Sequence, residues 1–483
     1  MDVGKTKGSF SSLALFIITI LLVLAARYHS LDFVQRSLWA EDGNIFYNGA
    51  NLLGLRSLFE PYAGYLHVYP RLIALISSPL NLSAIPYAYF FGWIMAFVLM
   101  RWAISVAFSE SQHANKLAFF VPALLLFMPH SGETFLSLTN TQWWIAISLA
   151  IMASTPEKFG KGSIPILVLM TLTGPFCILF APVCAIRSIQ TKRYWVLVPI
   201  ILGAAIQAYF LTESPRPSQA LDPDIDHWLV FLNNIVLFGG GNTLTLIASV
   251  AFWVSTMIIV LKSEYRYKAI IACAAIALAA SVYSMKGIIG ILSPYGDGSR
   301  YFVIPFALLA VATFSCEAYG RTLLIACMSL SVIFFNSNRL QPQVDMNFTT
   351  YVELSKYEAT LIPLAPRSPA PPGFYLKAES GITRPSQYSD YQVVDSVAKL
   401  EINACNNSGA VGLLGTVELL RSGNVTLSIK ENGSIIEETR NYPAGVQRIQ
   451  LATKKSLGPA DLEIKSERGV LASGPIRAKL ICM

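Results

Sequence analysis

Long apolar segments alternate with short polar connections from the N-terminus up to residue 340. The first segment, residues 10–26, carries no charged side chain and is long enough for a membrane-spanning helix. We favour an uncleaved helix over a cleaved signal peptide, because the apolar run is long and the following cleavage-site pattern is weak. The whole pattern predicts about eleven spans. These segments lie at 10–27, 84–108, 117–129, 142–154, 163–174, 176–187, 194–212, 242–261, 269–285, 301–317 and 322–336.

Positive charges follow the same alternation. Lysine and arginine gather in every second connection, which the positive-inside rule assigns to the cytoplasm. These residues are Lys5, Lys7, Lys116, Lys158, Lys161, Arg187, Lys192, Arg193, Lys262, Arg266, Lys268 and Arg321. The N-terminus is therefore expected inside, and the remaining connections and everything after residue 337 are expected outside.

The composition supports a membrane protein. Hydrophobic residues make up 54% of the chain, which is more than a soluble protein covers with polar surface. Of the seven cysteines, only Cys405 and Cys482 fall in the expected outer region, where one disulfide between them is plausible. The "GGGN" stretch at 239–242 lacks the lysine of a nucleotide-binding loop, and no His/Cys cluster suggests zinc. We expect no nucleic-acid partner.

The chain divides into three parts in this interpretation. Residues 1–340 form the α-helical membrane domain, with a long first outer loop at 28–83. A proline-rich linker occupies 341–375, and residues 376–483 form a small antiparallel β-sandwich. Period-two alternation predicts strands in 416–420, 424–440, 446–452, 461–466 and 476–483, and the Asn432-Gly433 turn predicts a hairpin within the second of these. We expect this β domain to have a structural or substrate-orienting role rather than a catalytic one.

Polar side chains of the outer loops are the candidate site. The first loop carries Trp39, Glu41 and Asp42 in "LWAEDGNIFY" (38–47) and then "YAGYLHVYPR" (62–71). Interfacial aromatic residues are typical of a membrane belt, but anchoring does not require the acidic pair or the cations. Further candidates come from the first loop and from the outer ends of later spans. They are Tyr65, His67, Arg71, Glu133, Asn140, Gln142, Trp143, Lys286, Arg300 and Tyr301.

These residue types fit group transfer from an anionic lipid phosphate to an alcohol. Arginine suits phosphate recognition, and we assign that role to Arg71 and Arg300, with His67 and Lys286 assisting. A carboxylate in a partly desolvated site can take the proton of a hydroxyl. The alternative, a set of interfacial ion pairs that orient helices, stays open at this point.

The first loop resembles that of the C-type membrane glycosyltransferases, which use polyprenyl-phosphate sugars. "WAEDGNIF" (39–46) and "PYAGYLHVYPRLIAL" (61–75) more narrowly resemble the bacterial and phage glucosyltransferases that modify O-antigen and switch serotype. "TNTQWW" (139–144), "SRYF" (299–302) and the exported tail extend the resemblance over most of the chain, although each of these is weak by itself. The sequence lacks the WWD signature of the oligosaccharide-transferring members.

The resemblance implies an inverting enzyme of the bacterial inner membrane with a periplasmic active site. It implies transfer of glucose from undecaprenyl-phosphate-glucose to an O-antigen repeat unit, alongside a flippase and a cytoplasmic undecaprenyl-phosphate glucosyltransferase. Glu41 is the favoured general base and Asp42 the second candidate. The remaining residues, Trp39, Tyr65, Glu133, Asn140, Gln142, Trp143 and Tyr301, are expected to contact substrate, and no obligatory cofactor or metal is expected.

Two other functions compete with this one. An O-antigen polymerase or ligase also uses a lipid-linked donor, but its large functional loop usually comes late in the membrane region. A transporter or flippase places charges near the bilayer midplane and often shows repeated halves, and neither feature is visible here.

Overall fold

The computed structural model describes the chain in segments. They are 6–28, 33–111, 114–129, 132–214, 220–239, 241–296, 298–315, 322, 326, 328–330, 333, 345–356, 360–365, 375–378, 389–392, 397–402, 411–431, 434–442, 444–453, 460–466, 470 and 475–482. The chain forms two compact units. One contains 1–31, 50–78 and 88–342, and the other contains 32–49, 79–87 and 343–483. We call them the helical unit and the β-containing unit and describe each by itself.

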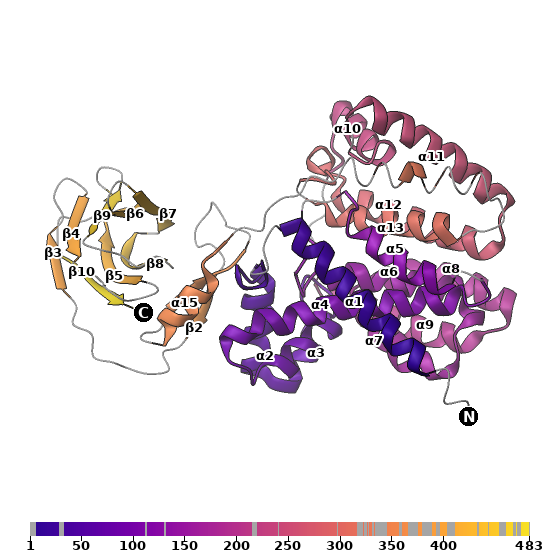
Figure 1. Ribbon diagram of the computed structural model, residues 1–483, viewed down its shortest axis with the longest axis horizontal. Coiled ribbons are helices and arrows are strands. Elements are labelled where there is room, and N and C mark those ends of the chain that lie inside the picture. The colour runs from indigo at the N-terminus through magenta and orange to yellow at the C-terminus, as the bar shows by residue number, and fades with distance from the viewer. Residues whose placement is uncertain are drawn as a thin grey trace. The chain divides into compact units, whose positions relative to one another are not determined.

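The first ten apolar segments predicted from the sequence each contain a helix (Figure 1). The helices are α1 (Thr6–Tyr28), α4 (Ile85–Ala107), α5 (Ala114–Leu125), α6 (Thr141–Ser154), α7 (Ile164–Thr171), α8 (Phe176–Thr191), α9 (Tyr194–Glu213), α11 (Thr243–Lys262), α12 (Tyr265–Met285) and α13 (Arg300–Ser315). Three more, α2 (Asn48–Leu53), α3 (Val68–Ser77) and α10 (Ile225–Val236), lie in the connections.

Four of the described helical segments are long and apolar enough to cross a membrane. These are Leu82–Ala107, Tyr194–Glu213, Thr243–Lys262 and Tyr265–Met285. Shorter apolar helices account for other predicted spans, so the expected number of about eleven is not confirmed.

Helix α6 forms the core of the helical unit. All 14 of its residues are buried, and it packs against α8, α12 and α13. A helix that is apolar on every side is stable only when other elements surround it. The N-terminus of α6, with Gln142 and Trp143, is therefore held by packing on several neighbours.

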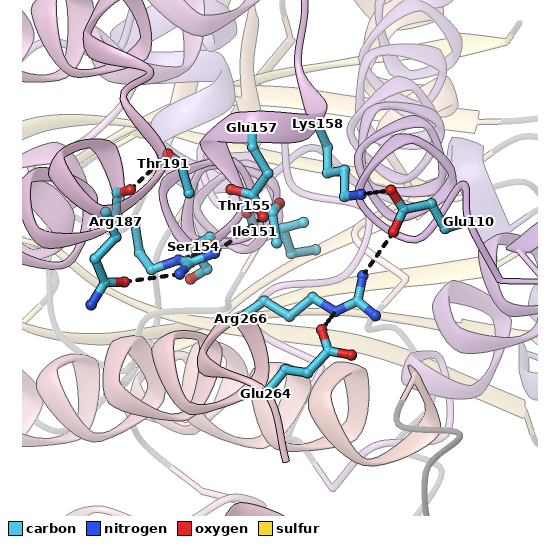
Figure 2. A network of polar contacts seen from close by, with 11 residues as sticks. Glu110, Ile151, Ser154, Thr155, Glu157, Lys158, Arg187, Thr191, Glu264 and Arg266 are labelled. Carbon is cyan, nitrogen blue, oxygen red and sulfur yellow. Dashed lines mark hydrogen bonds and ion pairs between the residues drawn. The ribbon is translucent and has the colours of Figure 1, made fainter.

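A polar network joins four helix ends of the helical unit (Figure 2). Lys158 and Arg266 both pair with Glu110, the latter at 3.9 Å, and Arg266 also lies 3.0 Å from Glu264. The buried Arg187 donates to the Ser154 carbonyl at 2.9 Å and to Glu157 at 3.1 Å. Lys158, Arg187 and Arg266 come from three connections that the charge pattern predicts on one side of the membrane. The network shows that these connections lie side by side.

The described strands of the β-containing unit form three antiparallel sheets (Figure 1). One four-stranded sheet has the order β3-β10-β5-β8, the other β4-β9-β6-β7, and β1 pairs with β2. The strands are β1 (Thr360–Pro363), β2 (Tyr375–Ala378), β3 (Ser389–Gln392), β4 (Val397–Ile402), β5 (Val411–Leu419), β6 (Gly423–Glu431), β7 (Ser434–Tyr442), β8 (Gly445–Thr453), β9 (Ala460–Ser466) and β10 (Pro475–Cys482).

The predicted small antiparallel β domain is confirmed by these sheets. Strands β6 and β7 pair from Gly423↔Tyr442 to Glu431↔Ser434, so two residues connect them, as the predicted hairpin requires. The turn residues themselves and Cys405 of the predicted disulfide lie outside the described residues. Helix α15 (Phe348–Ser355) and strand β1 lie in the segment that the sequence suggested to be a linker.

Candidate functional site

The acidic pair of the first loop lies in the β-containing unit. Trp39 forms a parallel bridge with Ala365, in which the Ala40 amide donates to the Ala365 carbonyl at 2.6 Å. The Ala365 amide in turn donates to the Leu38 carbonyl at 2.7 Å. The segment just before Glu41 is therefore held by backbone hydrogen bonds to a segment that follows the helical region in the sequence.

Glu41 and Asp42 have different surroundings although they are neighbours. Asp42 begins a π-helix, Asp42–Tyr47, and its side chain is completely buried, whereas Glu41 is partly exposed. On the same helix, a Cβ at Gly43 would lie 2.8 Å from the Leu364 side chain, so glycine lets the two segments approach closely. Glu41 is thus the less buried residue of the pair, although its Oε2 atom is buried.

A second group of predicted residues comes together in the helical unit. Arg300 at the start of α13 forms an ion pair with Glu133, with 2.5 Å between Nη1 and Oε1. The Arg300 amide and the Ser299 hydroxyl both donate to the other Glu133 oxygen at 3.4 Å. Asn140 donates from its side-chain amide to the Glu133 carbonyl at 2.9 Å. Glu133 thus holds the 132–140 connection against the beginning of α13.

Aromatic rings extend this group. The Trp143 ring lies 5.4 Å from Tyr301 and 5.1 Å from Phe176, edge to face in both pairs. The guanidinium of Arg300 lies over the Tyr301 ring at 5.4 Å. The sequence hypothesis did not include Phe176, because it follows the Gly174-Pro175 break inside an apolar run and carries no polar group. We call Glu133, Gln142, Trp143, Phe176, Arg300 and Tyr301 the aromatic–arginine cluster.

The turn between α7 and α8, at Gly174-Pro175, lies against the aromatic–arginine cluster. Gly174 has a φ of +83°, which favours glycine, and a Cβ there would lie 2.7 Å from Oε1 of Gln142. Its amide donates to the Leu66 carbonyl at 2.9 Å, and the Val68 amide donates to the Leu172 carbonyl at 3.1 Å. The "LTGPF" segment (172–176) therefore separates α7 from α8, and it also fixes the first loop.

His67 lies in this fixed part of the first loop and is fully buried. Its ring is 4.6 Å from the Tyr65 ring, and its Nε2 donates to the Tyr62 carbonyl at 3.2 Å. Burial lowers the pKa of His67 to about 3. The imidazole is therefore neutral at physiological pH and brings no positive charge to an anion.

Arg71 and Lys286 are the other two residues predicted to bind phosphate. Arg71 lies in α3 and is 3% exposed. Lys286 follows α12, with its ammonium 4.9 Å from the Tyr283 ring centre, and its carbonyl accepts the Asp222 amide at 2.8 Å. No described contact joins Lys286 to the Glu133–Arg300 pair.

Gln207 holds the backbone of the first loop in place, and the sequence hypothesis did not include it. It lies in the middle of the apolar helix α9, and its side chain accepts from the Leu66 amide at 2.8 Å and donates to the Leu66 carbonyl at 3.3 Å. A single buried polar residue within an apolar span was the signal that could have identified it.

Within the part of the chain that the structure describes, no group of three or more His, Cys, Asp or Glu side chains could hold a metal ion. A scan against protein-family models finds no match, and searches of curated proteins and of solved structures find none either.

Proposed function

We propose that the chain is a membrane glycosyltransferase that moves a hexose from a polyprenyl-phosphate donor to a glycan hydroxyl, with Glu41 as the general base. The observation that carries the proposal is the unequal burial of the acidic pair at the start of a π-helix. Short π-helical segments are rare and occur frequently at functional sites. A partly exposed glutamate beside a fully buried aspartate suits the roles of proton acceptor and positioning group.

The proposed reaction is a single displacement. Glu41 takes the proton of the acceptor hydroxyl, and the acceptor oxygen forms a bond to the anomeric carbon of the sugar. The bond between that carbon and the phosphate oxygen breaks, and the polyprenyl phosphate leaves with the bonding electrons. Attack opposite to the leaving group inverts the anomeric configuration. The reaction needs no oxidant, nucleotide or metal.

Two features of the helical unit favour a lipid-linked substrate. Its long apolar helices are suited to a bilayer, and the aromatic–arginine cluster offers polar and aromatic groups of the kind that orient a substrate's polar end. Glucose as the sugar, undecaprenyl phosphate as the carrier, the O-antigen unit as the acceptor and the periplasmic face of the bacterial inner membrane follow from the resemblance alone. The same is true of the flippase and the cytoplasmic glucosyltransferase as partners.

A transfer assay with the purified full chain tests the proposal. The protein is incubated in lipid nanodiscs with undecaprenyl-phosphate-glucose and O-antigen polysaccharide, and glucosylated product is counted. We expect Glu41→Gln to lower the rate by about 10²–10⁴-fold, the usual contribution of general-base catalysis. The matched control is Glu418→Gln, which changes an exposed glutamate of the same unit and leaves the rate unchanged.

Two results would contradict the proposal. Normal transfer by folded Glu41→Gln would remove Glu41 as the base. Movement of the lipid-linked sugar across the bilayer by wild type, without transfer to any acceptor, would indicate a transporter instead.

A further inference from the structure

Two buried polar atoms in the aromatic–arginine cluster have no hydrogen-bond partner among the described residues. They are Oε1 of Gln142 and Nε1 of Trp143, and their side chains are 4% and 8% exposed. A buried polar group without a partner destabilises a folded protein, so such groups are usually paired with protein, water or ligand. The two residues are consecutive at the N-terminal end of α6, whose position is fixed by packing.

The chemistry of the two atoms restricts what can pair with them. An amide oxygen only accepts a hydrogen bond, and an indole nitrogen only donates one. A hydroxyl group does both, whereas an ionised phosphate offers acceptors alone and would place its charge against the amide oxygen. The pair of atoms therefore fits a molecule that carries hydroxyl groups.

The charge of the cluster favours the same kind of ligand. Arg300 is already paired with Glu133, so the two side chains together carry no net charge. Arg300 remains 37% exposed as a side chain, which leaves part of its guanidinium able to donate to a neutral oxygen. Beside it, the Trp143 ring packs edge to face on Phe176 and on Tyr301, and Tyr301 is the one of these three rings that is partly exposed.

We infer that the aromatic–arginine cluster binds an uncharged sugar ring through its hydroxyl groups, and that Arg300 is a sugar-binding residue rather than the phosphate clamp of the donor. Gln142 accepts from one hydroxyl, Trp143 donates to a sugar oxygen, and the partly exposed Tyr301 ring packs against the ring carbons. The inference rests on the proposed function and deepens it, because it gives the helical unit by itself a binding site for a sugar ring.

Saturation-transfer NMR with the full chain in lipid nanodiscs tests the inference, once sugar-based detergent has been removed. The probes are methyl glucoside, in both anomeric forms, and inorganic phosphate. We expect saturable glucoside binding that phosphate does not displace. Gln142→Met and Trp143→Phe each remove one polar atom and keep most of the side-chain shape, and each is expected to raise the glucoside Kd about tenfold.

Two further variants sharpen the test. Gln142→Glu keeps acceptor oxygens and loses the donor, so it is expected to retain binding within about threefold if the site needs an acceptor there. Trp228→Phe is the matched control, because the Trp228 indole already donates to the Asp222 carbonyl at 3.0 Å elsewhere in the unit. It is expected to leave the Kd unchanged.

The inference is overturned if wild type shows no saturable glucoside binding, if phosphate displaces the glucoside, or if Gln142→Met and Trp143→Phe bind as wild type does. Its outcome is separate from that of the transfer assay. Glucoside binding with the expected variant effects but no transfer would leave the sugar site and remove the transferase. Transfer that is unaffected in Gln142→Met, together with unchanged binding, would remove only the sugar site.

Discussion

The backbone amide of Ala40 donates a hydrogen bond of 2.6 Å to the carbonyl of Ala365. Ala40 immediately precedes Glu41, and Ala365 comes after the helical region in the sequence. Met346 adds a second link of this kind, since its amide donates to the Arg36 carbonyl at 2.9 Å. The position of the proposed base within its unit therefore depends on residues that follow the apolar helices.

Replacing Ala365 by proline tests this dependence. Proline has no amide hydrogen, so Ala365→Pro removes the 2.7 Å hydrogen bond to the Leu38 carbonyl and leaves that carbonyl without this donor. We expect the transfer rate to fall at least about tenfold, because small displacements of a catalytic group are costly. Ala365→Gly keeps the amide and is the matched control. Equal rates for the two variants would show that the bridge does not position Glu41.

The Glu133–Arg300 pair leads to a prediction about stability. Glu133→Gln leaves the partly buried Arg300 guanidinium without its counter-charge. Arg300→Met leaves the Glu133 carboxylate without its counter-charge. We expect each single variant to lower the free energy of unfolding by about 1–2 kcal/mol. The double variant is expected to lose less than the sum of the two, because no charge is left unpaired.

A double-mutant cycle of thermal unfolding in nanodiscs measures this coupling. Additive losses would mean that the two side chains do not interact in the folded protein. Glu133→Gln has a second expected consequence, since it frees the Arg300 charge. That variant should gain measurable binding of inorganic phosphate, whereas wild type should not.

Hydropathy predicted the helices of this chain well, and it predicted their lengths less well. The first ten apolar segments each contain a helix because burial of apolar side chains decides where helices form in such a sequence. Four of the described helical segments are both long and apolar enough to cross a membrane, and the Gly174-Pro175 break divides one longer apolar run into α7 and α8. Strands β5 to β10 were predictable from period-two alternation, which buries Val425, Leu427 and Ile429 on one face of β6.

The candidate site was less predictable than the fold. Residue types identified Glu133, Arg300, Trp143 and Tyr301, but periodicity does not tell which side chains meet. The ion pair of Glu133 with Arg300 and the packing of Phe176 on Trp143 join residues far apart in the sequence. The resemblance ranks Glu41 above Asp42, but only the structure shows that Asp42 is fully buried and that Glu41 is partly exposed as a residue.

Gln207 provides a prediction about how the first loop is held. Gln207→Met keeps the size of the side chain but removes both hydrogen bonds to the Leu66 backbone, in a place where water does not replace them. We expect the free energy of unfolding to fall by about 1–3 kcal/mol, because the Leu66 amide loses its acceptor, whereas the Leu66 carbonyl still accepts from the Gly174 amide. Thermal unfolding in nanodiscs measures the loss, with the exposed Thr212→Val on the same helix as control. A loss no larger than that of the control would contradict the role of Gln207.

The last prediction concerns pH and the N-terminal end of α10. Nδ1 of His227 lies 2.9 Å from a carboxylate oxygen of Asp222, and Nε2 lies 3.6 Å from Asp224. The hydrogen bond with Asp222 raises the pKa of His227 above its ordinary value of 6.5. The pKa of Asp222 is lowered from 3.8, first by the Asp224 amide and then by the hydrogen bond with His227.

The raised pKa of His227 and the lowered pKa of Asp222 together define the pH range in which this contact stabilises the protein. A raised histidine pKa gives stability that is fully present below 6.5 and is lost as pH rises through the folded-state value. A lowered aspartate pKa gives stability that is present above 3.8 and is lost as pH falls through its folded-state value. We therefore expect His227→Gln to lower the unfolding temperature at about pH 5–6 and to have little effect at about pH 9. His67 does not titrate in this range, because burial holds its pKa at about 3. The same difference between wild type and His227→Gln at both pH values would show that the pair does not stabilise the folded protein through its charge.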